Sequence, residues 1–170
     1  MSYRFAITPI LCLGALTAAA ATARPAAHDA PLPTGAYVLA RAASARPPIP
    51  FQFQLAGSVV AGVVDSARIT LAADSSYTDK VTVRWTKAPA LPIPLPGFSA
   101  GPDPHTFTGS GRYVVQGGRV VLQPDDFVTK GFVRSVEAQS DSTGLTLTGL
   151  SGGFAGSHVP VNALFTRVKG

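Results

Sequence analysis

Ser76-Tyr77-Thr78-Asp79-Lys80-Val81-Thr82-Val83-Arg84-Trp85-Thr86 is the stretch that decides the fold class of this chain of 170 residues. Its even positions are all polar, and its odd positions are all apolar apart from Asp79. A period of two indicates a β-strand with one buried face, because successive side chains of a strand point to opposite sides. The stretch therefore predicts a strand whose inward-facing side chains are Tyr77, Val81, Val83 and Trp85.

The same alternation continues on both sides of this strand. It assigns an inward orientation to a further set of apolar residues: Phe51, Phe53, Leu55, Ile69, Leu71, Phe107, Tyr113, Val115, Leu145 and Leu147. We predict strands over residues 35–41, 51–55, 63–72, 76–86, 105–116, 119–123, 131–139, 144–149 and 162–168. No convincing helical pattern follows residue 23.

Short turns join the predicted strands. Asp74-Ser75-Ser76, Gln116-Gly117-Gly118 and Asp141-Ser142-Thr143-Gly144 separate neighbouring strand patterns, and these residue types tolerate turn geometry. Connections this short cannot carry a parallel crossover. The sequence therefore predicts an all-β protein, an antiparallel up-and-down meander of about eight or nine strands, either closed as a barrel or folded as a β-sandwich.

The beginning of the chain predicts export. Arg4 precedes an apolar run from Phe5 to Ala21, and the run ends in the small residues Ala21-Thr22-Ala23, as in a secretory signal peptide. The alternative, a transmembrane anchor, requires about 20 apolar residues, and this run is shorter. We expect a signal peptide over residues 1–23, a flexible leader over 24–34, a single domain over 35–170, and a periplasmic or extracellular location.

Removal of this signal would leave a chain without sulfur. The only cysteine, Cys12, and the only methionine, Met1, both lie within it. Disulfides, thiolate nucleophiles and sulfur-ligated metals are then excluded. The formal net charge of +5 comes from Lys and Arg residues that are spread singly, so we expect no nucleic-acid partner.

Two charged residues interrupt the predicted inner face. Asp79 shares the face of Tyr77, and Arg134 shares the face of Phe132 and Val136. Burial of either charge alone is costly, so we expect the two to pair with each other, to pair with another group, or to line a wet cavity. The alternative is that both lie near strand ends and meet solvent at the barrel rim.

Two glycines also lie at inward positions. Gly109 and Gly111 belong to the strand that carries Phe107 and Tyr113. Missing side chains at these positions either let the sheet curl or leave room for a ligand.

The segment from Ala88 to Pro104 is the most unusual connection in the chain. Six prolines alternate with apolar residues there, so we expect an extended, polyproline-like loop. Loops of this length are either functional or disordered. It is interpreted as a lid over a barrel mouth, as a docking segment for a protein or envelope partner, or as a linker packed on its own barrel.

Short motifs over nearly all of residues 35 to 168 resemble a known family. They are Gly35-Ala36-Tyr37-Val38-Leu39, Pro47-Pro48-Ile49-Pro50-Phe51, Leu71-Ala72-Ala73-Asp74-Ser75-Ser76-Tyr77, Gly111-Arg112-Tyr113-Val114-Val115 and Leu164-Phe165-Thr166-Arg167. Together they resemble those of small exported bacterial lipocalin-like β-barrel proteins. In lipocalins, the aromatic residue of a Gly-x-Trp motif on the first strand packs under a basic side chain of the last strand. This chain has Tyr in place of that Trp, and the resemblance assigns barrel closure to Tyr37 and Arg167.

The resemblance implies an extracytoplasmic barrel that binds a small apolar molecule. Our leading interpretation is an exported, monomeric, lipocalin-like protein that binds a small hydrophobic or amphipathic ligand in the barrel. The candidate ligand-binding residues are inner-face aromatics and the two inward charges: Phe53, Tyr77, Asp79, Trp85, Phe107, Tyr113, Phe132 and Arg134. The alternative is a non-enzymatic structural or protein-interaction module of the cell envelope that acts through the loop from Pro89 to Pro104.

The sequence does not predict an enzyme. His28, His105 and His158 are dispersed along the chain and lack the local spacing of metal ligands. We therefore assign no catalytic residue, no metal site and no cofactor.

Overall fold

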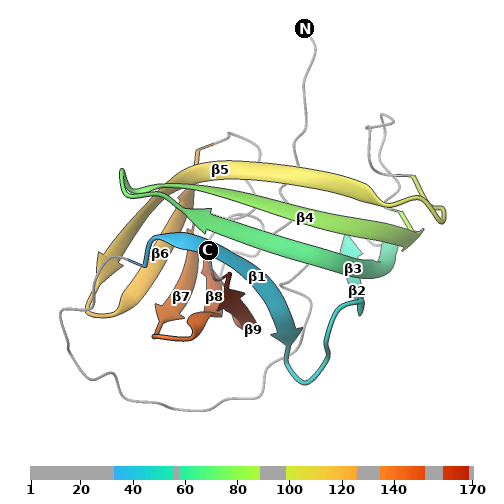
Figure 1. Cartoon of the computed structure of the whole chain (residues 1–170). Helices are drawn as coiled ribbons and strands as arrows, with labels where there is room; N and C mark the ends of the chain where they lie inside the picture. The colour runs from blue at the N-terminus through green and yellow to red at the C-terminus, as the bar shows by residue number, and fades with distance from the viewer. Residues whose placement is uncertain (1–32, 56–57, 89–98, 126–134, 152–158, 169–170) are drawn as a thin grey trace, which may run out of the picture.

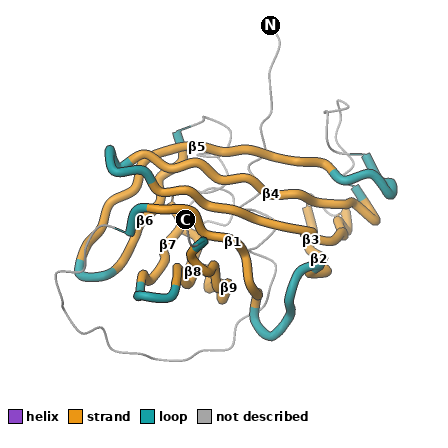
Figure 2. Tube along the Cα trace, in the orientation of Figure 1, coloured by secondary structure: helices purple, strands orange, loops and turns teal. Residues whose placement is uncertain are grey.

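The computed structural model describes residues 33–55, 58–88, 99–125, 135–151 and 159–168. Within these residues the chain forms nine β-strands and no helix (Figures 1 and 2). The strands are β1 (Gly35–Ala42), β2 (Ile49–Leu55), β3 (Ser58–Leu71), β4 (Ser76–Lys87), β5 (His105–Gln116), β6 (Arg119–Pro124), β7 (Ser135–Ser140), β8 (Gly144–Ser151) and β9 (Val159–Arg167). The expectation of an all-β fold is confirmed.

The strands close into a barrel because β1 is paired on both of its edges. The order of the sheet is β1-β9-β8-β7-β6-β5-β4-β3-β2, and β1 also pairs with β3. All of these pairs are antiparallel. Eight strands therefore form a closed up-and-down barrel, to which β2 adds one further strand. This closure excludes the β-sandwich and is consistent with a lipocalin-like barrel.

β1 and β2 share one edge of the long strand β3. Residues 35–38 of β1 pair with residues 68–71, whereas β2 pairs with residues 58–64. Beyond Val38, β1 leaves β3 and continues along β9 as far as the pair Ala42–Ala163. We call β2, residues 58–64 of β3 and the adjoining ends of β4 and β5 the sheet extension (Figure 1).

The predicted start of the third strand at residue 63 is wrong, because β3 begins at Ser58. A register shift between Val64 and Ser66 explains why alternation did not reveal the earlier part. Before this bulge the even-numbered Val60 and Val64 are buried, and after it the odd-numbered Ile69 is buried. A β-bulge inserts one residue on one strand only, so it reverses which parity faces inward.

The interior of the barrel is built by the predicted inner face. In β4, Tyr77, Val81, Val83 and Trp85 are each at most 3% exposed, as the alternation predicts. The other strands contribute buried apolar residues to the same core, among them Tyr37, Ile49, Ile69, Tyr113, Val120, Val136, Leu145 and Phe165. Phe107 and Val115 pack against this core but are only partly buried.

Two hairpins are fixed by an aspartate at the same position of the turn. The Asp74 carboxylate accepts hydrogen bonds from the backbone nitrogen and the hydroxyl of Ser76, at 2.9 and 2.6 Å. The Asp141 carboxylate likewise accepts bonds from the backbone and the hydroxyl of Thr143, at 2.7 and 2.6 Å. The hydroxyl bonds are the main reason why the pKa values of both carboxyl groups lie below their usual range.

Several expectations concern residues outside the described ranges. These are the signal peptide over 1–23, the leader up to residue 32, and the predicted strand residues 131–134. Most of the proline-rich loop, residues 89–98, also falls outside. Among the described residues, no helix is long and apolar enough to span a membrane.

Gly111 occupies a position where β5 passes close to its neighbours, which gives a test of the barrel geometry. An added Cβ would lie 2.1 Å from the Gln123 carbonyl oxygen and 2.7 Å from the Tyr77 ring. The space above this glycine is therefore filled by protein, and Gly111→Ala is expected to lower the free energy of unfolding by about 2 kcal/mol or more. Urea denaturation measures the change.

Gly101→Ala is the matched control, because no atom lies within 4 Å of its added Cβ. We expect the control to change the free energy of unfolding by less than about 0.5 kcal/mol. Equal effects of the two substitutions would contradict the close approach at Gly111.

Candidate functional site

An aromatic cluster lies on the inner side of the sheet extension. The Trp85 ring of β4 meets Phe51 of β2 at a centroid distance of 5.6 Å and Phe107 of β5 at 6.3 Å. The interplanar angles are 86° and 77°, so both contacts are edge-to-face, which is a favoured geometry for aromatic pairs. We call Phe51, Trp85 and Phe107 the aromatic cluster.

Gly62 makes room for this cluster. A Cβ on Gly62 would lie 2.8 Å from the Cζ atom of Phe51 and 2.6 Å from the Arg84 carbonyl oxygen. The absence of a side chain on β3 therefore lets the Phe51 ring lie against the sheet. Phe51 and Trp85 are 6% and 2% exposed, whereas Phe107 is only partly buried.

The structure divides the predicted ligand-binding aromatics into two groups. Trp85 and Phe107 belong to the aromatic cluster, whereas Tyr77 and Tyr113 lie near the β3–β4 turn at the other end of β4. Tyr77 and Tyr113 are each 1% exposed, and the Tyr113 hydroxyl donates a hydrogen bond to the Ala72 carbonyl at 2.7 Å. Burial raises the pKa of this hydroxyl. The two tyrosines thus fill the core beside the turn.

Phe51 was not among the predicted ligand-binding residues. Alternation correctly placed it on the inner face, but the sequence gave no reason to separate it from the other inward residues. Only the pairing of β2 with β3 brings its ring to Trp85. The side chain of Phe53, and all of Phe132 and Arg134, lie outside what the structure describes.

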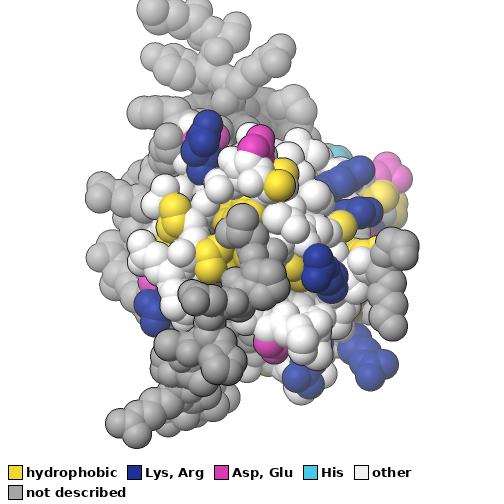
Figure 3. Space-filling view, turned by 60° about the vertical axis from the view of Figure 1, so that its left-hand side comes forward, with side chains coloured by type: hydrophobic (Ala, Val, Ile, Leu, Met, Phe, Trp, Pro, Cys, Tyr) yellow, Lys and Arg dark blue, Asp and Glu magenta, His cyan; other side chains and the backbone are white. Residues whose placement is uncertain are grey.

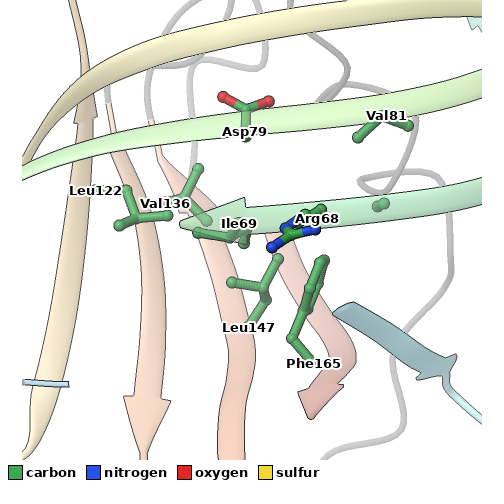
Figure 4. A pocket seen from close by; sticks show the side chains of 9 residues that line it. Arg68, Ile69, Asp79, Val81, Leu122, Val136, Leu147 and Phe165 are labelled. Carbon is green, nitrogen blue, oxygen red and sulfur yellow. The ribbon is translucent and has the colours of Figure 1, made fainter. Parts of the chain in front are cut away.

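Asp79 is buried within the barrel, being 4% exposed. It borders a cavity of about 10 Å³, whose other walls are Ala67, Arg68, Ile69, Val81, Leu122, Val136, Leu147 and Phe165 (Figure 4). A space of this size holds about one water molecule. Its carboxylate therefore does not meet solvent at the rim, and the cavity beside it is far too small for an organic ligand.

The residues predicted to close the barrel lie opposite each other. Tyr37 of β1 is the Cα partner of Arg167 of β9. The Tyr37 hydroxyl donates a hydrogen bond to the Pro33 carbonyl at 2.6 Å, and Arg167 donates one to the Thr34 carbonyl at 2.5 Å. Burial raises the pKa of Tyr37, and the positive charge of Arg167 partly offsets that rise. Both side chains thus tie the incoming chain to the β1–β9 seam.

A groove that the sequence analysis did not single out lies on the outer face of β3, β4 and β5. Its volume is about 440 Å³, and it is lined by Arg68, Thr70, Thr78, Asp79, Lys80, Thr108, Gly109 and Ser110. In the sequence, these residues, apart from Asp79 and Gly109, appear as the polar, even-numbered positions of the three strands. Alternation alone identifies such residues as outward-facing but not as neighbours across strands.

Histidine and carboxylate side chains of the described residues were the candidates for metal or catalytic chemistry. No group of three or more His, Cys, Asp or Glu side chains is close enough there to hold a metal ion. His105 is within 3.3 Å of the Ser99 hydroxyl in an exposed position, and His28 and His158 are outside the described residues. In the view of Figure 3, the Lys and Arg side chains are scattered over the visible face and its edges and do not gather in one patch.

The burial of Asp79 makes its predicted pairing with Arg134 testable. We expect Asp79→Asn and Arg134→Gln each to lower the free energy of unfolding. The double variant should lower it by less than the sum of the two single changes. The coupling free energy should be about 1 kcal/mol or more, since a buried charge depends strongly on its partner. Chemical denaturation of the four proteins measures it.

Lys87 provides a control for this cycle, because it is an exposed cation on the same strand as Asp79. Asp79→Asn and Lys87→Gln should act additively. Strict additivity for Asp79 and Arg134 as well would show that they do not form a pair.

Comparison with known proteins gives no relative of this chain. No family model matches it, and neither a curated protein nor a solved structure shows significant similarity. Inference about its function therefore rests on its own side chains and their arrangement.

Proposed function

We propose that this protein is an exported, non-enzymatic, lipocalin-like binding protein that takes a small hydrophobic or amphipathic ligand. The observation that carries the proposal is the aromatic cluster of Phe51, Trp85 and Phe107 on the sheet extension. The apolar run and small residues before Arg24 support export.

The position of the cluster favours binding at the end of the molecule that carries the sheet extension. The space beside Asp79, in the middle of β4, is only about 10 Å³, and the end near the β3–β4 turn is filled by Tyr77 and Tyr113. Phe107, in contrast, is only partly buried against the core. Ligand sites typically combine apolar and aromatic walls with a few polar groups. A ligand that covers the Phe107 ring would gain the free energy of removing that apolar surface from water.

The chain itself supplies a reporter for this site. Trp85 is the only tryptophan, so its fluorescence emission reports on the aromatic cluster alone. We expect lauric acid, used as an amphipathic probe, to change the Trp85 emission with saturation. Phe107→Ala should weaken the affinity about tenfold or more, because loss of a buried ring contact costs more than about 1.4 kcal/mol.

Val114→Ala is the matched control, since Val114 lies on the same strand but is 40% exposed. The control should bind lauric acid as the unaltered protein does. An absence of saturable emission change, or equal affinities of the Phe107 and Val114 variants, would overturn the proposal.

The proline-rich segment reaches the cluster at its described end. The Gly101 backbone nitrogen donates a hydrogen bond to the Trp85 carbonyl at 3.1 Å, so residues after the segment are anchored beside the cluster. Replacing residues 89–98 with a Gly-Ser linker of equal length keeps this bond. We expect the replacement to weaken lauric acid binding several-fold, because a proline-rich apolar sequence is exchanged for a flexible polar one.

The same replacement distinguishes the alternative function. Unchanged lauric acid affinity and unchanged urea stability would make the segment a spacer with respect to the ligand. If, in addition, the unaltered protein bound an envelope component and the linker variant did not, the interaction module would replace the ligand-binding interpretation.

A further inference from the structure

The outer face of β3, β4 and β5 presents two parallel cross-strand rows of polar residues. The first row is Arg68, Lys80 and Thr108, and the second is Thr70, Thr78 and Ser110; consecutive members of each row are Cα partners. These six side chains line the open groove of about 440 Å³. We propose that this groove binds a phosphorylated sugar, with the phosphate held by Arg68 and Lys80 and the sugar hydroxyls facing the other row.

Arg68 and Lys80 place two positive charges side by side on the outer face. Arg68 and Lys80 are directly opposite on neighbouring strands and the same face, an arrangement that is destabilising for like charges. Two other outward cations of the sheet have a carboxylate beside them. Arg84 forms an ion pair with Asp65, and Arg119 forms one with Glu137. No described carboxylate lies within ion-pair distance of Arg68 or Lys80.

Asp79 also borders the groove, and its charge must be considered. Asp79 is the Cα partner of Gly109, and this pair lies between the two rows. Its side chain belongs to the inner face and is 4% exposed, so its carboxylate does not reach the solvent of the groove. The charged groups that a ligand in the groove would contact are therefore Arg68 and Lys80.

The hydroxyl groups indicate a sugar rather than a bare anion. In the adjoining row, the hydroxyls of Thr82 and Thr106 lie 3.1 Å apart and hydrogen-bond to each other. Within the described residues, the four hydroxyls of the groove have no such side-chain partner. A hydroxyl both donates and accepts, which matches the hydroxyls of a carbohydrate. The groove is also much larger than a single tetrahedral oxyanion requires.

Calorimetric titration of the protein with glucose-6-phosphate tests the proposal. We expect saturable binding that weakens as salt is added. The double variant R68Q/K80Q should bind about tenfold or more weakly, because charge-assisted hydrogen bonds to the phosphate are lost. Glucose and inorganic phosphate, titrated separately, should each bind more weakly than glucose-6-phosphate.

The double variant R41Q/K87Q is the matched control, since it removes two exposed cations away from the groove. It should keep the affinity for glucose-6-phosphate within about twofold. Without ligand, the melting temperature of R68Q/K80Q should be no lower than that of the control variant. The reason is that R68Q/K80Q removes the repulsion between opposed like charges. Normal melting combined with lost binding supports the groove as a site.

Three results would overturn the proposal. They are no binding of glucose-6-phosphate by the unaltered protein, equal affinities of the two double variants, and inorganic phosphate binding as tightly as the sugar phosphate. Trp85 emission should be insensitive to glucose-6-phosphate, because Trp85 is on the inner side of the sheet. The outcome is thus independent of whether lauric acid binds at the aromatic cluster.

Discussion

The double pairing of β1 is the constraint on which the rest of the structure depends. By pairing with β9 on one edge and with residues 68–71 of β3 on the other, this strand leaves the barrel without an open edge at its seam. Closure removes exposed edge groups that would otherwise invite pairing with other chains. The hydrogen bonds of Tyr37 to Pro33 and of Arg167 to Thr34 hold the incoming chain at the same seam.

The sheet extension exists because the strands differ in length. β3 is longer than β1 can cover, and β2 takes up the remaining edge as the sheet extension. The bulge between Val64 and Ser66 lets one strand serve both parts, because it keeps apolar residues on the inner side in each. As a result, the aromatic cluster is separated along β4 from the tightly filled core around Tyr77 and Tyr113.

β4 contributes side chains to both candidate sites, one on each face of the sheet. Its inward Trp85 belongs to the aromatic cluster, whereas its outward Lys80 belongs to the polar groove. The two surfaces differ in chemistry because alternating side chains of one strand face different environments. The proposed apolar ligand and the proposed phosphorylated sugar would therefore lie on opposite faces of β4 and β5 and contact different side chains.

The sequence by itself determined the all-β class, the antiparallel order and most of the inner face. Short turns forbid parallel crossovers, and alternation in segments such as Ser76 to Thr86 leaves only one orientation that buries the apolar side chains. It also identified Asp79 as an inward charge, which the structure finds buried. These features depend on residues that are close together in the sequence, so the sequence is enough to predict them.

Tertiary structure alone decided the closure, the early start of β3 and which side chains meet in each candidate site. Barrel and sandwich share the same alternation and differ only in which distant strands pair, as β1 does with β3 and β9. The bulge in β3 reverses parity without a distinctive sequence signal. Phe51 meets Trp85, and Arg68 meets Lys80, only through the register between strands. Register is a property of pairs of strands, and no single strand encodes its partner.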